Sequence, residues 1–482
     1  MNTQRSLAVI VAACMLLALA APVLAAEDYP HHAQFIAYND PDALAHAASL
    51  LTGTPGYTYV NPAALTSEKT ASKTSIGIMT TPLSTDWPQF HYNAAHTGTS
   101  PSTGLPSDNT TVWSANIQAI GTMNPIISNG KVFVLTGYAG FDEPTALTQI
   151  NLTCMDESTG SVLWNFPLPR TVHYGSWSSP ATDGDYVYVS SDNKHYAVDY
   201  SGNEVWNFTS FEVNVNGGPS IGGDNVFFSD WGGNYYSLNK ATGSLNWVFN
   251  NSDTVSFDMQ YSQGSPAYDA ADNSIYVTGY TYSGGSGGPG SRGYLYKVNA
   301  SGGEEWSVQS NQGENFCGSA AFDGSQVYVT SYNFSGDGRL YAYAKSNGAA
   351  QWRGNFPSIE RTDATPAIVN GLVYVTGGWN GGYYGSAEPG VRAYYTNNGT
   401  LKWSRINQNM GGWTDSASVA DGYVYVGKES GDNSLYCYNT TYALNVATGA
   451  TEWFYPQGGA TAAIANGKMY TIGNNGYLYR FG

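Results

Sequence analysis

The sequence predicts an all-β protein, an eight-bladed β-propeller built from four-stranded antiparallel blades. Three observations lead to this prediction: the composition, one tryptophan that recurs at near-regular spacing, and an apolar strand that follows each recurrence. Of 482 residues, 57 are Gly, 38 are Tyr and 13 are Trp, and only 11% are charged. Aromatic and β-branched runs interrupted by Gly favour strands and tight turns over helices.

The recurring tryptophan returns at spacings of 51, 42, 41, 59, 46, 51 and 50 residues. Seven of the eight copies follow a turn that contains Gly, such as residues 239–243 before Trp247. Gly there supplies the positive φ of a hairpin turn. A large indole on an outer strand can fill the wedge between two blades, so all eight are predicted to dock neighbouring blades. They are Trp113, Trp164, Trp206, Trp247, Trp306, Trp352, Trp403 and Trp453.

Each tryptophan is followed by a short run of small residues, then a turn, then an alternating apolar strand. The run Ser179-Pro180-Ala181 is one example. Small residues suit the crowded strand beside the propeller axis. Four short strands in each period of 41–59 residues are typical of a propeller blade. The eight apolar strands are centred near Val132, Val187, Val226, Ile275, Val327, Val373, Val424 and Met469.

The two ends of the repeat complement each other. The first Trp strand, residues 111–114, has no inner strands before it, and the last strand, Tyr477–Phe481, has no Trp strand after it. Each end supplies what the other lacks. The N-terminal strand is therefore predicted to close the eighth blade.

The repeated unit resembles the PQQ-like β-propeller repeat, found in quinoprotein dehydrogenases and in the propeller lipoprotein of the bacterial outer-membrane assembly machinery. Blades of that family carry an Ala-X-Asp-X-X-Thr-Gly-X-X-X-Trp motif, and Ala443–Trp453 matches it with Asn445 in place of Asp. Cys154–Trp164 matches it with Cys154 in place of Ala. Residues 86–90 and 96–101 also resemble the lead-in of exported members. The resemblance covers residues 86–482 and implies the fold more specifically than the function.

The N-terminus is typical of a cleavable secretory signal over residues 1–25. A short polar start with Arg5 precedes an apolar run from Leu7 to Ala21, which Pro22 ends. An uncleaved anchor is the alternative, but the run is short for a membrane span. Residues 26–85 are predicted to form a small extension and a Ser/Thr-rich linker, and 86–482 the propeller. The mature protein is expected to be secreted, periplasmic or on the cell surface, monomeric, and without a transmembrane segment.

Charge and cysteine content exclude several classes of function. Thirty-six acidic against 19 basic residues give a net charge of −17, which argues against binding nucleic acid. Outside the signal only Cys154, Cys317 and Cys437 occur, at wide spacings, so neither a disulfide framework nor a zinc site is predicted. Buried, unpaired thiols inside strands are expected instead. No HExxH, GxSxG or phosphate loop occurs, and no metal site is predicted.

Candidate ligand-binding residues lie in the connections that open on the face opposite the Gly turns. Variable loops on a rigid scaffold commonly carry binding. A propeller has a central channel along its axis, and the candidates for a site at the mouth of this channel, on the face opposite the Gly turns, are Arg170, His173, Trp177, Asp258, Gln260, Glu314, Asn315, Arg361, Asp363, Trp413 and Asp415. Aromatic side chains expected to be exposed in loops, and suited to sugar rings or protein interfaces, are Trp231, Trp379, Tyr383, Tyr384 and also Trp413.

The leading functional hypothesis is an exported, non-catalytic propeller that serves as a binding or scaffold module for envelope or extracellular proteins or glycans. No cofactor is expected. The alternative implied by the resemblance is a dehydrogenase of alcohols or sugars that uses PQQ with calcium. Glu314, Asn315, Asp363 and Asp415 could supply some of the six to eight oxygens that calcium needs. Against this alternative, the vicinal cysteine pair of many such dehydrogenases and their additional pocket-building loops are absent from the sequence.

Overall fold

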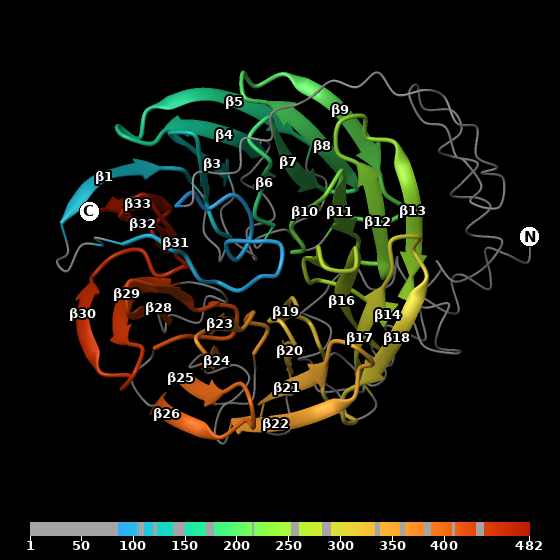
Figure 1. The fold of residues 1–482 in the computed structure, drawn as a ribbon. Helices are drawn as coiled ribbons and strands as arrows, with labels where there is room; N and C mark the ends of the chain where they lie inside the picture. Colours follow the sequence, from blue (N-terminus) through green and yellow to red (C-terminus); the bar gives the residue numbers. More distant parts are fainter. Residues whose placement is uncertain are drawn as a thin grey trace, which may run out of the picture. The chain divides into compact units, whose positions relative to one another are not determined.

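The computed structural model describes part of the chain, and within that part the strands form a ring of eight antiparallel sheets (Figure 1). The described residues are 85–482 except 104, 106–109, 119–122, 138–149, 170–177, 215, 252–259, 282–290, 333–337, 357–361, 380–386, 407–409 and 430–437. The predicted signal segment 1–25 and, apart from Thr85, the predicted extension 26–85 lie outside them. The predicted all-β, eight-bladed propeller is confirmed.

Blades 1 to 4 follow one another along the chain. Blade 1 contains β2 (Ile126–Ser128), β3 (Lys131–Thr136), β4 (Ile150–Asp156) and β5 (Val162–Leu168). Blade 2 contains β6 (Ala181–Thr182), β7 (Tyr186–Ser191), β8 (Lys194–Asp199) and β9 (Glu204–Thr209). Blade 3 contains β10 (Ser220–Gly222), β11 (Asn225–Ser229), β12 (Asn234–Asn239) and β13 (Leu245–Asn250). Blade 4 has a fifth short strand and contains β14 (Gln260–Tyr261), β15 (Ala267–Asp269), β16 (Ser274–Thr281), β17 (Gly293–Val298) and β18 (Glu304–Gln309).

Blades 5 to 8 complete the ring. Blade 5 contains β19 (Ala321–Phe322), β20 (Gln326–Thr330), β21 (Gly338–Ala344) and β22 (Ala350–Phe356). Blade 6 contains β23 (Ala367–Val369), β24 (Leu372–Trp379), β25 (Ala387–Tyr395) and β26 (Leu401–Ile406). Blade 7 contains β27 (Ser418–Ala420), β28 (Tyr423–Glu429), β29 (Tyr438–Asn445) and β30 (Thr451–Tyr455). Blade 8 contains β31 (Ala463–Ala465), β32 (Lys468–Ile472), β33 (Tyr477–Phe481) and, from the other end of the propeller, β1 (Thr111–Asn116).

The pairing of β1 with β33 closes the ring as predicted. The two strands are antiparallel, with Ser114 opposite Tyr479 and Asn116 opposite Tyr477. Figure 1 shows β1 on the outside of blade 8, beside the C-terminus. The residues at the two ends of the propeller therefore belong to one hydrogen-bonded sheet.

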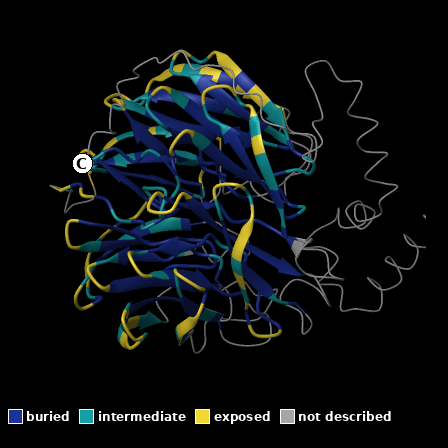
Figure 2. Ribbon diagram, turned by 45° about the vertical axis from the view of Figure 1, so that its right-hand side comes forward, coloured by how far each residue is buried: buried dark blue, intermediate teal, exposed yellow. Residues whose placement is uncertain are grey.

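Burial falls from the inside of the ring to its outer edge. The innermost strand β31 is wholly buried, whereas residues of the outermost strand β1 alternate between half-buried and exposed. Figure 2 shows the same gradient, with buried residues inside and exposed ones along the outer strands and turns. The predicted buried, unpaired thiol inside a strand is confirmed for Cys154, which lies in β4. Cys317 is also buried and unpaired, but its predicted place inside a strand is wrong, because it lies between β18 and β19. Cys437 lies outside the described residues.

The predicted docking role of the tryptophans is confirmed by a repeated hydrogen bond. Within the described residues, seven of the eight indole Nε1–H groups donate to a carbonyl in the Gly turn of the next blade, at 2.7–3.1 Å. The Gly of that turn lies against the indole: a Cβ on Gly449 would lie 2.6 Å from Trp403. The motif therefore joins consecutive blades through one indole and one glycine.

The eighth tryptophan, Trp453, differs for a topological reason. Its Nε1–H is buried and has no hydrogen-bond partner among the described residues. The next blade is blade 8, whose strands β33 and β1 come from opposite ends of the propeller and are not joined by a Gly turn. Among the described residues, Trp453 therefore has no Gly-turn carbonyl oxygen to accept its indole N–H, whereas the other seven indoles each have one.

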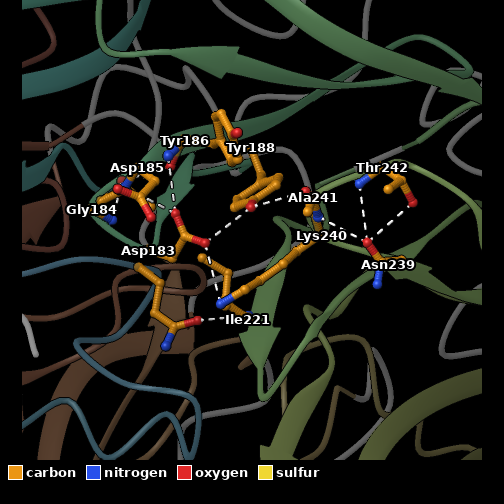
Figure 3. A network of polar contacts seen from close by, with 12 residues as sticks. Asp183, Gly184, Asp185, Tyr186, Tyr188, Ile221, Asn239, Lys240, Ala241 and Thr242 are labelled. Atoms are coloured by element: carbon orange, nitrogen blue, oxygen red, sulfur yellow. Dashed lines mark hydrogen bonds and ion pairs between the residues drawn. The ribbon is translucent and has the colours of Figure 1, made fainter. Parts of the chain in front are cut away.

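The junction of blades 2 and 3 shows how polar contacts reinforce this docking (Figure 3). Asp183, in the turn before β7, accepts a hydrogen bond from Tyr188 at 3.2 Å and forms a 3.3 Å ion pair with Lys240 of blade 3. The Tyr188 hydroxyl also lies 3.2 Å from the Lys240 carbonyl oxygen, which accepts the Trp206 indole hydrogen bond as well. One turn of blade 3 thus holds three side chains of blade 2 and fixes the angle between the blades.

Candidate functional site

A ring of small polar residues lines the propeller just before the innermost strands. Backbone N–H groups of one blade donate to side-chain hydroxyls of the next: Ser265 N–H to Ser319 Oγ at 2.8 Å, and Ser416 N–H to Thr461 Oγ1 at 2.9 Å. Asn124 of blade 1 donates through Nδ2 to the Thr461 carbonyl at 2.8 Å, which joins blade 8 to blade 1. The blades are therefore also tied together around the axis. These eight positions, six of which carry a hydroxyl, are here called the hydroxyl ring: Asn124, Ser179, Gly218, Ser265, Ser319, Thr365, Ser416 and Thr461.

Residues 85–102, here called the strap, cross the inside of the ring next to these strands. In Figure 1 the strap is the blue segment at the centre of the propeller. It hydrogen-bonds to all eight blades, from Trp87, whose N–H donates to the Ile127 carbonyl at 3.0 Å, to Ser102, whose Oγ accepts from Gly467 at 2.8 Å. The bonded residues lie three positions after the hydroxyl ring in seven of the blades. The strap therefore occupies the ring on the side of the short turns.

The strap and the inner residues of blades 3 to 7 enclose a polar cavity of about 40 Å³. Phe90 of the strap forms one wall, and the remaining walls come from positions of the hydroxyl ring or one or two residues before it. Side chains there are amides, hydroxyls, one thiol and one carboxyl. The lining residues are Phe90, Asn216, Gln263, Ser265, Cys317, Gly318, Ser319, Asp363, Thr365, Thr414 and Ser416. This axial pocket has room for a few water-sized molecules.

Burial shifts the ionisable groups of the axial pocket toward their neutral forms. Burial raises the pKa of Asp363 to about 8, although the nearby Trp413 indole and Cys317 thiol act to lower it. Burial, followed by the charge of Asp363, raises the pKa of the Cys317 thiol well above its usual value. Both shifts favour the protonated forms of the carboxyl and the thiol, and the Cys317 thiol is not an activated nucleophile.

Five of the predicted channel-mouth residues have described side chains, and only Asp363 lines the axial pocket. Its N–H donates to the carbonyl of Trp413 at 2.8 Å, so these two predicted residues lie together. Asp415 is fully buried beside them, where its Oδ2 accepts from Gly427 N–H at 2.6 Å. Burial raises the pKa of Asp415 to about 8.

Glu314 and Asn315 serve the packing of blades 4 and 5 instead of facing the axial pocket. The Glu314 carboxylate accepts a hydrogen bond from Tyr341 in β21 and lies 4.0 Å from Arg339. Asn315 forms backbone hydrogen bonds in both directions with Tyr332. Both residues therefore hold connections in place.

The remaining predicted site residues give no side-chain geometry. Gln260 begins β14 and Trp379 ends β24, with only their strand positions described. Arg170, His173, Trp177, Asp258, Arg361, Tyr383 and Tyr384 lie outside the described residues. Their predicted binding role stays a prediction.

The expected exposure of two aromatic residues is wrong. Trp231 and Trp413 are buried, with 1% and 6% of their surface exposed. Trp231 makes an edge contact with Tyr261, and Trp413 stacks on Tyr332 at a centroid distance of 4.9 Å. These two tryptophans pack against aromatic rings inside the protein instead of facing solvent, which keeps the interior densely packed.

Sequence reasoning missed the strap and most of the axial pocket. The signal for the pocket was present in the small residues before each innermost strand, since Asn216, Gln263, Cys317, Asp363 and Thr414 each stand two positions before a ring residue. The repeat places these positions on the same inner surface. The strap was noticed only as a resemblance, because no repeat explains residues 85–102.

The docked blades, the hydroxyl ring and the strap define a closed eight-bladed propeller with a blind polar pocket. Residues 105–285 and 291–479 match the family model described as outer membrane protein assembly factor BamB, and the chain belongs to this PQQ-like propeller family. It is 22% identical over 343 residues to the tetrathionate hydrolase of Acidithiobacillus ferrooxidans, covering 63% of each chain. The chain spans less than two thirds of the length of the curated relatives it matches.

Solved structures agree with the fold. A europium-containing methanol dehydrogenase superposes with a TM-score of 0.62 at 12% identity, covering 82% of this chain and 98% of that one. BamB from Moraxella catarrhalis superposes with a TM-score of 0.53 at 14% identity, covering 77% and 97%. At these identities the likeness concerns the fold, and function has to be argued from the site.

The described residues do not fit the PQQ and calcium of the alternative hypothesis. The cavity of about 40 Å³ is far smaller than the roughly 300–1,000 Å³ of pockets that hold drug-sized ligands. Within the described part of the chain, Asp363 is the single carboxyl in the cavity wall, and no cluster of three His, Cys, Asp or Glu could hold a metal. No catalytic step through PQQ is derived for this protein.

The whole chain is expected to show no change in thermal stability when PQQ and calcium are added. A ligand present at 100 times its Kd stabilises a folded protein by about 2.7 kcal/mol, which a thermal unfolding scan detects readily. A clear upward shift would contradict the expectation and favour the dehydrogenase alternative. Oxidation of alcohols and sugars would then be assayed.

Proposed function

We propose that this protein is an exported, non-catalytic propeller that binds a protein partner of the cell envelope through one face. The observation that carries the proposal is the difference between the two faces of the ring. Short Gly turns, with the strap beside them, close one face. On the other, here called the open face, several long connections leave the strand ends, and exposed connections on a rigid scaffold are suited to recognition.

The direction of the strands supports this asymmetry. Because neighbouring strands are antiparallel, the connection from second to third strand and the connection to the next blade leave from the same face. On that face Thr136 is separated from Ile150, and Thr281 from Gly293, by more than ten residues. On the opposite face β24 follows β23 after only two residues.

The chemistry of the axial pocket supports binding over catalysis. Burial raises the pKa of its carboxyl to about 8 and that of its thiol well above the usual value, and its other polar groups are amides and hydroxyls. A catalytic nucleophile needs a neighbour that lowers its pKa or removes its proton. The groups that act on the Cys317 thiol raise its pKa, so the thiol is not activated as a nucleophile.

The class of partner follows from the family. The family model is described as an outer membrane protein assembly factor, and one structural neighbour is BamB. Transferred to this chain, that likeness supports a protein partner, and the predicted signal segment 1–25 supports an envelope location. Among the described residues, no helix is long and apolar enough to cross a bilayer.

The proposal is tested by replacing connections on the open face with Gly-Ser segments of equal length. The full chain, used as bait on its own envelope extract, is expected to retain a defined partner and to lose it when residues 282–290 and 380–386 are replaced. Cross-linking with mass spectrometry must place that partner on the open face. The matched control is Phe454→Ser, a change at an exposed outer-strand side chain that is expected to leave binding intact.

Two results would contradict the proposal. Loss of the partner in the Phe454→Ser control, with binding kept in the loop replacements, would place the interface on the outer rim. Binding to soluble polysaccharide that disappears in Trp379→Ala, without any protein partner, would favour the glycan hypothesis.

A further inference from the structure

The strap is the one described segment that touches every blade. Backbone N–H groups of blades 2, 4, 5, 6 and 7 donate to its carbonyls: Thr182 to Pro88, Tyr268 to Ala94, Phe322 to Ala95, Ile368 to Thr97 and Val419 to Gly98, at 2.8–3.1 Å. Blade 3 donates through Ile221 to the Gln89 side chain at 3.0 Å. Blades 1 and 8 complete the set. Whether the inside of the propeller is sealed on this side therefore depends on one short segment.

Two histidines hold the strap at its centre, and both are completely buried. His91 Nδ1 lies 2.7 Å from the His96 carbonyl oxygen, and its Nε2 lies 2.8 Å from the Ala417 carbonyl oxygen of blade 7. His96 Nδ1 lies 3.0 Å from the Ala320 carbonyl oxygen of blade 5, and its Nε2 lies 3.2 Å from Ser220 Oγ of blade 3. The two rings thus connect the strap to three blades.

The surroundings of the rings disfavour a positive charge. His91 is the ionisable group that acts on His96, and a charge on one ring would disfavour a charge on the other. No carboxylate of the described residues is among the groups that act on either ring. The other groups around them are backbone carbonyls, the Ser220 hydroxyl and the Phe90 ring, which lies 5.6 Å from His91 and 5.3 Å from His96 between centroids. A charge here would be buried without a counter-ion, which is costly.

We propose that the strap is an acid-released seal: protons taken up by His91 and His96 detach it from the inner strands and open the floor of the axial pocket. The proposal concerns the strap alone and holds whatever partner the open face binds. Phe90 couples the two events, because it lies on both histidine rings and also forms a wall of the pocket. Movement of the rings therefore moves the pocket wall.

The two rings take up protons one after the other, His91 before His96. His91 has carbonyl oxygens at both nitrogens, so a second proton there gains a hydrogen bond. His96 accepts from Ser220 when its Nδ1 donates to Ala320, and a second proton abolishes that acceptor. Burial lowers the pKa of His91 to about 4 and that of His96 to about 3, with the charge of His91 adding to the effect on His96.

The direction of the pH dependence follows from these values. An exposed histidine has a pKa of 6.5, so the released strap binds protons that the docked strap does not. Docking is therefore fully stable above about pH 7 and weakens as the pH falls toward 4. At pH 5 the equilibrium for release is expected to increase about 30-fold for each histidine relative to pH 8, and about 1,000-fold for both.

Hydrogen exchange of the full chain, corrected for the intrinsic pH dependence of exchange, measures this release. The reporters are the blade amides that donate to the strap, such as those of Thr182, Ile368 and Val419. They are expected to lose protection between pH 8 and pH 5, while amides inside β7 and β8 keep theirs. In the double variant His91→Gln/His96→Gln the reporters are expected to lose this pH dependence.

The matched control is His195→Gln. His195 is also completely buried, in β8, and burial lowers its pKa to about 3, but it has no contact with the strap among the hydrogen bonds described. Its replacement is expected to leave the acid response of the reporters unchanged. Protection that stays constant from pH 8 to pH 5 in the unmodified protein would overturn the proposal even if the double variant fails to fold. So would reporters that exchange in step with β7 and β8, or that still respond to acid in the double variant.

Discussion

Replacing Phe481 with alanine is expected to lower the free energy of unfolding by about 3–5 kcal/mol, the usual cost of removing a buried aromatic ring. Phe481 is fully buried at the end of β33, and its ring lies 4.0 Å from that of Tyr455 between centroids. Tyr455 belongs to blade 7, so this contact joins blades 7 and 8. The backbone of Phe481 also pairs with Thr111 of β1. The substitution therefore removes a side-chain contact between blades 7 and 8 at the strand that closes the ring.

Phe454→Ala is the matched control for this change. Phe454 lies in the neighbouring strand β30, but 53% of its surface is exposed, and its loss is expected to change stability by less than about 0.5 kcal/mol. Urea-induced unfolding followed by intrinsic fluorescence compares the two variants. Equal midpoints for both would show that closure through β33 contributes little to stability.

Replacing Gly449 with alanine is expected to destabilise the protein by about 2–5 kcal/mol. Gly449 has φ of +69°, a conformation that costs an L-residue about 1–2 kcal/mol. A Cβ there would also lie 2.6 Å from the Trp403 ring, and overpacking of this kind costs about 1–3 kcal/mol. The indole would have to move away from the Val446 carbonyl oxygen that accepts its hydrogen bond at 3.1 Å.

Gly130→Ala separates the two causes. Gly130 has φ of +73°, but nothing lies within 4 Å of the position its Cβ would take. This variant is expected to lose only the backbone contribution of about 1–2 kcal/mol. Thermal and urea unfolding of the two variants would contradict the docking argument if Gly130→Ala proved as destabilising as Gly449→Ala.

Much of the fold could be predicted because the same sequence pattern recurs eight times along the chain. The returning Trp, the Gly turn before it and the apolar strand after it define a blade by local spacing alone. Closure could be predicted for a similar reason, since the strand around Trp113 lacks the inner strands of its blade and the strand Tyr477–Phe481 lacks the outer one. The orphaned indole of Trp453 follows from that closure, although only the structure reveals it.

Much less of the candidate site could be predicted. Asp363 and Trp413 were singled out and do lie together, but as a buried pair beside a small polar cavity. Glu314 was singled out by the same reasoning, as a candidate in a connection on the same face, but its carboxylate contacts Tyr341 instead. A loop residue's place in the sequence does not say whether its side chain turns toward the axis or into the wedge between blades, because both directions lie within reach of the same backbone.

The sequence by itself determined the all-β class, the number of blades, the docking tryptophans and the closing strand, because each depends on periodic spacing that local physics interprets. Only the tertiary structure decided that the strap seals the ring, that Trp231 and Trp413 are buried, and that Asn216, Gln263 and Cys317 face one cavity with Asp363. These features arise from contacts between residues tens to hundreds of positions apart. Such contacts form only once the eight blades have closed into a ring.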